Sequence, residues 1–285
     1  MKKYNFSSGP AILPQSLFEQ AAKATLDYQN SGLSILEISH RSEAFVEIME
    51  GAKKLVVELL DLDDDFEVLF LTGGASTQFC LVPFNLLPSN GLAFYLDTGT
   101  WSEKAIKEAK IFGNVEVLAS SKSSNFNHIP KNYQIPDQAT YCHITTNNTI
   151  YGTQMHEMPK TKVPIVADMS SDIFSKKIDM NQFGMVYAGA QKNLGPAGTT
   201  LLLVRKSLLG KANRAIPSML DYRVHIAKKS AFNTPPVFPI YCCYLGLQWI
   251  KEKGIAQIEQ DNLLKAKLIY DEIDRNSLTK GHSLI

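Results

Sequence analysis

The sequence lacks a cysteine framework, a long apolar run and a charge of one sign. Its four cysteines, Cys80, Cys142, Cys242 and Cys243, form no CxxC pair and have no zinc-ligand spacing, which indicates reduced thiols in a cytosolic protein. No apolar stretch approaches the ~18 residues that a membrane-spanning helix needs. The 29 basic and 28 acidic residues nearly cancel, so the charge gives no reason to expect a nucleic acid or a membrane as partner.

Internal repeats, low-complexity segments and an apolar secretion signal behind the N-terminal MKKYNFSSGP are missing too. What is present is a chain of 285 residues, long enough for one large or two medium domains with a sizeable core. Helical patterns cover residues 14–32, ending at an Asn-Ser-Gly stop, and residues 42–62, where Ser42 is the expected N-cap.

Short apolar runs follow, at residues 66–72, 92–97, 115–120, 140–146, 163–168, 185–190 and 199–204. Helical patterns separate the early runs. This alternation predicts an α/β fold with a mostly parallel, seven-stranded sheet that helices cover on both faces. The last two runs lie too close together for a helix between them, so we expect an antiparallel pair there. Two more helical patterns follow Pro239.

Ligands of open parallel sheets gather at the carboxyl ends of the strands. The polar residues that directly follow the apolar runs are therefore the candidates for a functional site. They are Gly73-Gly74-Ala75-Ser76, Trp101, Asn147-Asn148-Thr149, Asp168 and Gln191-Lys192.

Lys192 and Asp168 carry the most specific chemistry of this set. A lysine amine that can be desolvated forms an imine with a carbonyl cofactor such as pyridoxal phosphate, although a lone lysine is more often simply solvated. Asp168 favours the cofactor, because a carboxylate beside the ring nitrogen keeps that nitrogen protonated. Its alternative is a helix N-cap worth about 1 kcal/mol. We expect the two side chains to flank one flat ring.

The stretch LTGGASTQF at residues 71–79 fits a phosphate cradle, because glycines let the backbone approach an anion at the start of a helix. A routine strand-to-helix turn is equally compatible with it. Trp101 could stack on a pyridine ring, or it could fill the core between helix and sheet. Thr149 could donate to the phenolic oxygen of the ring, or it could form a turn beside two asparagines.

The motifs FSSGPAILP, ISHRS, GGASTQF, DTGTWS, ADMSSD, YAGAQKNLGPAG and NTPPVFPIY occur in this order. Together they resemble the phosphoserine aminotransferases, which are fold-type I pyridoxal-phosphate enzymes of the class-V aminotransferase branch, and the resemblance runs to about Asn276. It implies a homodimer with the fold-type I transferase fold. It also implies an N-terminal arm at 1–15, a large cofactor-binding domain at 16–260, and a linker helix and the start of an incomplete small domain at 261–285.

The resemblance implies roles for single residues as well. Lys192 would be the Schiff-base lysine and proton carrier, and Asp168 would pair with the ring nitrogen. The implied cofactor-binding residues are Gly74, Ala75, Ser76, Trp101, Thr149, Asp168, Gln191 and Lys192, with Asn233 and Thr234 reaching the cofactor phosphate of the neighbouring subunit. The implied substrate-binding residues are Ser8, Gly9, His40 and Arg41. No metal is implied.

The implied reaction moves the amino group of glutamate to 3-phosphohydroxypyruvate, giving 2-oxoglutarate and O-phosphoserine for serine biosynthesis in the cytoplasm. Pyridoxine biosynthesis, with 4-phosphohydroxythreonine as substrate, is a further implied role. Two alternatives stay open. Members of the family continue past the point where this chain closes, and His282 does not match their His-Arg pair, so the chain could be a remnant that binds cofactor with little turnover. A related pyridoxal-phosphate lyase or desulfurase would need a reactive cysteine.

Overall fold

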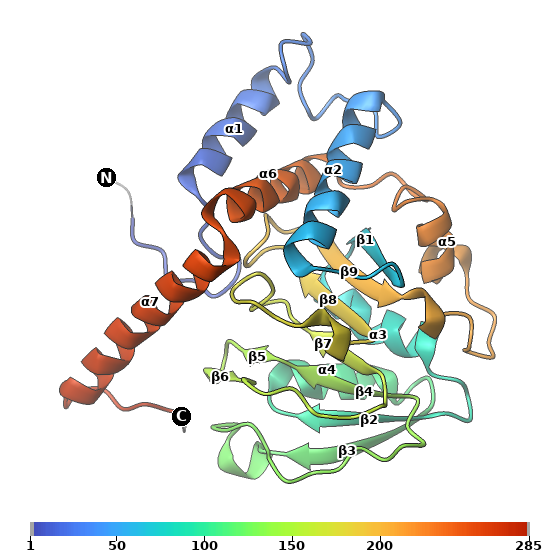
Figure 1. The fold of residues 1–285 in the computed structure, drawn as a ribbon, viewed down its shortest axis with the longest axis vertical. Coiled ribbons are helices and arrows are strands. Elements are labelled where there is room, and N and C mark those ends of the chain that lie inside the picture. Colours follow the sequence, from blue (N-terminus) through green and yellow to red (C-terminus); the bar gives the residue numbers. More distant parts are fainter. Residues whose placement is uncertain (1–2, 284–285) are drawn as a thin grey trace.

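A seven-stranded sheet, in the order β1-β9-β8-β7-β4-β2-β3, forms the centre of the computed structural model, which describes residues 3–283 (Figure 1). Its strands are β1 (Phe66–Thr72), β2 (Leu92–Asp97), β3 (Asn114–Ser120), β4 (Tyr141–Thr145), β7 (Ile165–Asp168), β8 (Met185–Gly189) and β9 (Thr199–Arg205). β9 runs antiparallel to both β1 and β8, and the other neighbouring pairs are parallel. A separate hairpin joins β5 (Asn147–Asn148) and β6 (Thr153–Gln154).

The predicted mostly parallel sheet is thus confirmed, including the antiparallel pair of β8 and β9. Every residue of β7 and β8 is buried, as is nearly all of β9. Helices cover the sheet on both faces, so neither face of these strands is exposed to solvent. Strands of this kind are apolar along nearly their whole length.

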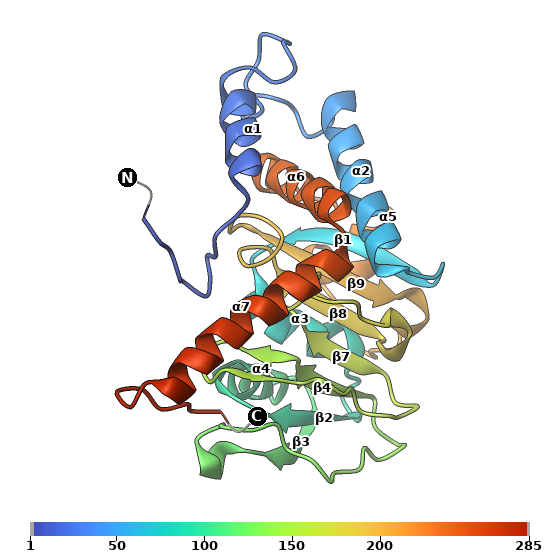
Figure 2. The same cartoon turned by 60° about the vertical axis from the view of Figure 1, so that its left-hand side comes forward.

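Helices cover both faces, as expected. They are α1 (Gln15–Leu26), α2 (Glu43–Leu60), α3 (Ala75–Leu86), α4 (Thr100–Ala109), α5 (Tyr222–Ala227), α6 (Val237–Lys253) and α7 (Ile255–Arg275). α3, α4 and α5 share one apolar core with the sheet, whereas α1, α2 and α6 share the other. Figure 2 shows α7 leading from α6 away from α1 and α2, and no residue of α7 is buried. Ser42 caps α2, as predicted, by accepting the N–H of Phe45 at 3.4 Å.

Two helix limits differ from the prediction. α1 ends at Leu26, before the Asn-Ser-Gly stop, because Asp27 is extended and its Oδ1 accepts the N–H of Gly32 at 3.0 Å. α6 begins at Val237, so Pro239 lies in its first turn rather than ahead of the helix. A proline costs little there, since the first N–H groups of a helix have no partner within the helix.

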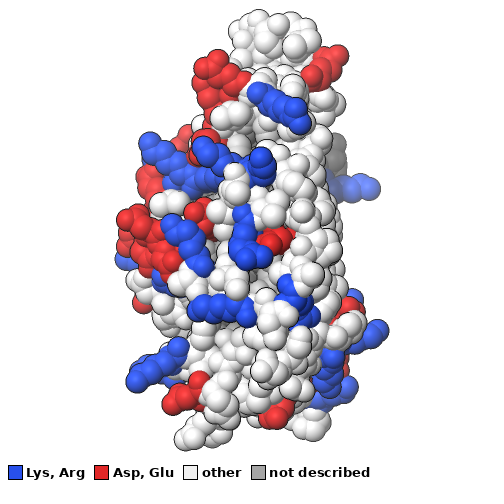
Figure 3. Space-filling model, turned by 90° about the vertical axis from the view of Figure 1, so that its right-hand side faces the viewer, with Lys and Arg blue, Asp and Glu red and all other residues white. Residues whose placement is uncertain are grey.

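Charges of both signs are mixed on the surface that Figure 3 presents, where lysines and arginines lie among acidic residues. Within residues 3–283, no helix combines the length and apolarity needed to cross a membrane. The same part of the chain contains no cluster of three or more His, Cys, Asp or Glu side chains suited to a metal ion.

Candidate active site

The loops after β2, β4, β7 and β8 meet at the edge of the sheet where the parallel strands end. Asn148 Nδ2 donates to Thr98 Oγ1 at 3.2 Å, which joins the loops after β4 and β2. Asn147 Nδ2 donates to Ser171 Oγ at 2.9 Å, which joins the loops after β4 and β7. Asn193 Nδ2 reaches the carbonyl oxygen of Ser171 at 3.3 Å and adds the loop after β8. These bonds link the loops that carry the predicted residues Asn147, Asn148, Asp168 and Lys192.

Lys192 lies in the turn from β8 to β9, between buried Ala190 and buried Leu194. Its Nζ donates to Thr149 Oγ1 at 3.1 Å. Burial lowers the pKa of the half-buried amine, and the Asp168 carboxylate opposes this only in part. An amine with a lowered pKa is unprotonated in a larger fraction of the molecules at neutral pH, and only the unprotonated amine can act as a nucleophile or a general base.

The N-terminal arm packs against this lysine. A Cβ atom on Gly9 would stand 3.0 Å from Cε of Lys192, so the arm lies directly on the lysine side chain. The N–H of Ala11 donates to the carbonyl oxygen of Gln191 at 2.9 Å. Both predicted arm residues, Ser8 and Gly9, are exposed, and Gly9 closely approaches the Lys192 side chain.

Asp168 ends β7 with its side chain 5% exposed. Its Oδ1 accepts two bonds from Ser170, from Oγ at 2.6 Å and from the backbone N–H at 2.9 Å. Burial raises the pKa of the carboxyl, and the Ser170 bonds and the charge of Lys192 lower it in part. Residues 169–175 form turns rather than an α-helix, so Asp168 caps a turn and the helix N-cap alternative is wrong.

Sequence reasoning missed several residues around this carboxylate. Ser170 is one, and His143 and Tyr187 are two more, with the Nε2 of His143 2.8 Å from the Tyr187 hydroxyl oxygen. Burial lowers the pKa of His143 to about 3, so its ring is neutral. The signal was present in β4, because strand alternation places Tyr141 and His143 on the same face.

The predicted phosphate loop follows β1. Gly73 and Gly74 have φ angles of 110° and 76°, a region that favours glycine. No side chain caps α3, and although the N–H of Thr77 donates to the carbonyl oxygen of Gly74, the N–H groups of Ala75 and Ser76 stay open to an anion. Trp101, in the first turn of α4, is only half-buried, and its buried Nε1 has no hydrogen-bond partner among the described residues.

Four predicted residues lie in two other connections of the chain. His40 and Arg41 lie in the connection between α1 and α2, which stands at the top of Figures 1 and 2, away from the turn between β8 and β9. Asn233 and Thr234 lie between α5 and α6, where Asn233 Nδ2 donates to the carbonyl oxygen of Thr234 at 3.1 Å. Within residues 3–283, no hydrogen bond joins these four to Lys192, Asp168 or Thr149.

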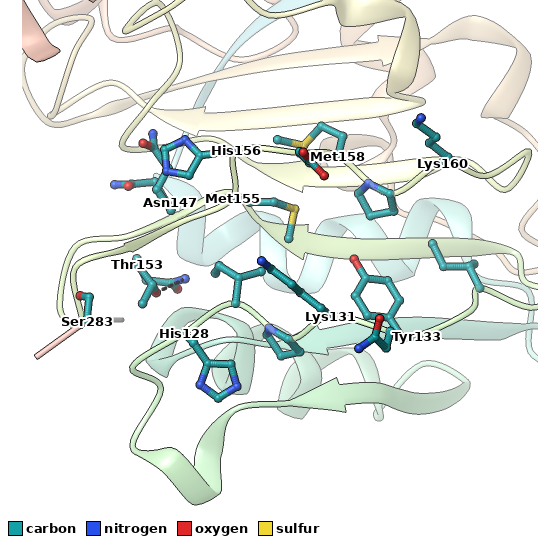
Figure 4. Close-up of a pocket in the computed structure, with 18 of the residues that line it drawn as sticks. His128, Lys131, Tyr133, Asn147, Thr153, Met155, His156, Met158, Lys160 and Ser283 are labelled. Carbon is teal, nitrogen blue, oxygen red and sulfur yellow. Dashed lines mark hydrogen bonds between the residues drawn. The ribbon is translucent and has the colours of Figure 1, made fainter. Parts of the chain in front are cut away.

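A hollow of about 2030 Å³ opens beside Thr149 and extends to α7. The segments that line it are residues 128–137, 152–162 and part of α7. Figure 4 shows Lys131 and Tyr133 on one side of it and Met155 and Met158 on the other. Thr149 lines the hollow and also accepts the hydrogen bond of the Lys192 amine, whereas Lys192 itself does not line the hollow.

The class-V aminotransferase family matches residues 3–282. A phosphoserine aminotransferase of Flavobacterium psychrophilum is 60% identical over 99% of this chain and 80% of the relative. This chain belongs to the phosphoserine aminotransferase family. A solved phosphoserine aminotransferase of Trichomonas vaginalis with bound pyridoxal phosphate has a TM-score of 0.95 at 34% identity, over 99% of this chain and 80% of that one. The enzyme of Bacillus circulans subsp. alkalophilus has a TM-score of 0.92 at 45% identity, over 96% and 77%.

Membership of the phosphoserine aminotransferases confirms the expected fold and the expected enzyme class, a transaminase. The expected cofactor agrees with the one bound in the Trichomonas vaginalis relative. The chain spans about four fifths of the length of these relatives, with 80% of the Flavobacterium psychrophilum enzyme matched.

Proposed function

We propose that this chain transfers an amino group from glutamate to 3-phosphohydroxypyruvate with pyridoxal phosphate as cofactor, giving 2-oxoglutarate and O-phosphoserine. One observation carries the proposal: the half-buried amine of Lys192 bonds to Thr149 and lies within electrostatic reach of buried Asp168. Relatives that are 60% and 57% identical and are named phosphoserine aminotransferase support it. The same transfer to the related acceptor of 4-phosphohydroxythreonine metabolism would serve pyridoxine biosynthesis.

The residues at the sheet edge fit pyridoxal phosphate. A buried carboxylate such as Asp168, its pKa raised by burial, is stabilised by a positively charged N–H donor beside it, which a protonated ring nitrogen supplies. When bound, the cofactor supplies an electron sink that makes the α-hydrogen of an amino acid acidic. The residues that we propose to hold it are Gly74, Ala75, Ser76, Trp101, Thr149, Asp168, Gln191 and Lys192.

Several of these residues have distinct tasks in the proposal. The open N–H groups at the start of α3 bind the phosphate, and the indole of Trp101 stacks on the ring. Thr149 orients the Lys192 amine through their 3.1 Å hydrogen bond. Burial favours the neutral amine of Lys192, which can accept a proton at Nζ and return it as a general base and acid.

We further propose a homodimer in which Asn233 and Thr234 reach the cofactor phosphate of the neighbouring site. This would explain why no hydrogen bond within residues 3–283 links them to Lys192 of the same chain. His40 and Arg41, together with Ser8 and Gly9, are proposed to meet the carboxylate or phosphate of the substrate. A guanidinium suits either group because it can donate two parallel hydrogen bonds.

We also propose a division into an arm at 1–15, a large domain at 16–260, and a linker helix with the start of a small domain at 261–285. The structure describes the arm from residue 3 onward and the last segment as far as residue 283. α7 runs without a break through the boundary at 260, so it would link the two domains.

We propose a cytoplasmic enzyme, because its four cysteines are free thiols.

The desulfurase alternative is disfavoured by the cysteines. Burial raises the pKa of all four thiols, to about 12 for Cys142 and about 11 for Cys242. A reactive cysteine instead needs a lowered pKa that favours the thiolate. The remnant alternative differs from the proposal only in turnover, so an experiment must separate the two.

The glutamate response of the protein loaded with pyridoxal phosphate tests the proposal. We expect near-visible absorption from cofactor attached to Lys192, and we expect glutamate to change it and release 2-oxoglutarate. Lys192→Ala should lose both signals, because no amine remains to attach the cofactor. Lys211→Ala, in an exposed loop, is the matched control and should keep both. Loaded protein with no response to glutamate would favour the remnant, and an unchanged spectrum in Lys192→Ala would contradict the assignment of the lysine.

A further inference from the structure

Two buried polar side chains, His143 of β4 and Tyr187 of β8, lie on either side of the strand that ends in Asp168. Asp168 pairs with Tyr187 in the register of β7 and β8, while His143 pairs with Val166 in the register of β4 and β7. Residues two apart on a strand share a face, so all three polar side chains point to the same side of the sheet. His143 is 2% exposed and Tyr187 is fully buried.

The hydrogen bond of 2.8 Å between His143 Nε2 and the Tyr187 hydroxyl crosses over β7. The pKa of Tyr187 is raised well above its usual value, first by burial and then by the negative charge of Asp168. Tyr187 and Asp168 are partners in the register of β7 and β8 and their side chains share a face, so we place the hydroxyl hydrogen toward the Asp168 carboxylate, while the hydroxyl oxygen accepts from His143. This arrangement requires the hydrogen of the neutral imidazole on Nε2.

The second ring nitrogen of His143 supports this assignment. Nδ1 is buried and has no hydrogen-bond partner among the described residues. With the hydrogen on Nε2, Nδ1 is an acceptor without a donor. The opposite tautomer would bury an N–H donor without a partner and leave Tyr187 to give its hydrogen to His143 instead of to the carboxylate.

We propose that His143 and Tyr187 form a hydrogen-bond relay, from His143 Nε2–H to Tyr187 Oη–H to the Asp168 carboxylate, that fixes the direction and charge of this carboxylate. Both are positioning residues, since they act through Asp168. No bond is made or broken in the relay, and no proton leaves its atom. The inference rests on the proposed role of Asp168 at the ring nitrogen of the cofactor.

Other groups act on Asp168 as well. Ser170 donates two hydrogen bonds to Oδ1, the Lys192 amine lowers the pKa of the carboxyl, and the Asp172 carboxylate raises it. None of these groups belongs to the relay, so they stay in place when the relay is altered. A donor to a carboxylate lowers its pKa, and removal of the relay should therefore raise the pKa of Asp168.

The test follows the carboxyl carbon of Asp168 by ¹³C NMR during a pH titration of the full chain without added cofactor. Asp168→Asn identifies the signal. We expect the midpoint to rise by about one pH unit in Tyr187→Phe, which loses a hydrogen bond to a charged group, and by about half a unit in His143→Phe. His143→Gln keeps an N–H donor and should return the midpoint toward that of the unaltered protein.

Tyr141→Phe is the matched control. It removes a hydroxyl from the same buried layer, where Tyr141 and Tyr95 share a hydrogen bond of 2.9 Å, and it leaves the relay intact. Its midpoint should equal that of the unaltered protein. If the midpoint stays unchanged in both Tyr187→Phe and His143→Phe, the relay is refuted.

A second measurement needs no core substitution. ¹⁵N NMR of the histidine-labelled, unaltered protein should show His143 as the neutral Nε2–H tautomer from about pH 5 to 8. The Nδ1–H tautomer would overturn the relay even if every variant failed to fold. Failure of the proposed function gives a different result: Asp168→Asn would then keep cofactor affinity and the glutamate response, whatever the NMR data show.

Discussion

At the scale of single residues, His143 should make folding stability depend on pH. Its pKa of about 3 in the folded protein lies below the value of about 6.5 in an unfolded chain, so the unfolded state binds the extra proton. The contribution is complete above about pH 6.5 and is lost as the pH falls toward 3, by up to about 1.4 kcal/mol per pH unit.

Urea unfolding at about pH 7 and pH 5.5 measures this effect. The unaltered protein should lose about 1 kcal/mol more than His143→Gln between the two pH values. His156→Gln, which changes an exposed histidine, should behave like the unaltered protein. Equal losses in His143→Gln and the unaltered protein would mean that His143 is not buried as a neutral ring.

Some residues of the candidate site could be predicted from the sequence, and others could not. Lys192, Thr149 and Asp168 were predicted because each is a polar residue directly after an apolar run. His143 and Tyr187 were missed because they lie inside such runs, where a histidine or tyrosine is usually a core residue. Only the register of three strands brings them to Asp168.

At the scale of elements, the contact of α6 with the turn that carries Lys192 should tolerate no added methyl group. A Cβ atom on Gly246 would lie 2.2 Å from the carbonyl oxygen of Leu194, two residues from Lys192. We expect Gly246→Ala to lower the free energy of unfolding by at least about 2 kcal/mol, despite the better helix propensity of alanine, and to weaken the glutamate response.

Chemical denaturation and the glutamate assay measure the two effects. Gln248→Ala is the control on the same helix, because it removes side-chain atoms instead of adding one against the turn. It should change stability by less than about 1 kcal/mol. A Gly246→Ala protein with unaltered stability and activity would show that α6 can move away from the turn at no cost.

Element limits were predictable to different degrees. β1 and β2 have the residues that their apolar runs predicted, because a buried strand ends where its apolar side chains end. The end of α1 was not predictable in this way, since it depends on one side-chain bond from Asp27 to the backbone of Gly32. The short hairpin of β5 and β6 has two residues in each strand, too few for a periodic pattern.

At the scale of the whole molecule, the proposed dimer can be tested by mixing two inactive proteins. Lys192→Ala lacks its own amine, and a double variant, Asn233→Ala with Thr234→Ala, would lack the groups that serve the partner site. In a mixed dimer, the site with intact Lys192 receives intact Asn233 and Thr234 from the other subunit. Activity should return to as much as about a quarter of that of the unaltered enzyme, since half of the dimers are mixed and each has one intact site.

Unfolding and refolding the two proteins together allows the subunits to exchange, and the transaminase assay follows the recovery. Each protein treated alone is the control and should stay inactive. No recovery, with mixed dimers present by sedimentation or mass measurement, would place Asn233 and Thr234 at the site of their own chain.

The order of the strands was not available from the sequence. β1 pairs with β9, more than a hundred residues later in the chain, and an apolar run does not specify which distant run will lie beside it. The class of fold was nevertheless predictable, because the alternation of apolar runs and helices leaves few ways to bury both faces of the sheet.

The single reversed strand has a mechanical consequence. β8 and β9 are both buried and are joined by a turn of nine residues, 190–198, in which Ala190 and Leu194 are almost wholly inaccessible. The main chain at position 192 is therefore held in place by buried residues before and after it. Movement of the Lys192 Nζ must therefore come from rotation about the four carbon–carbon bonds of its own side chain.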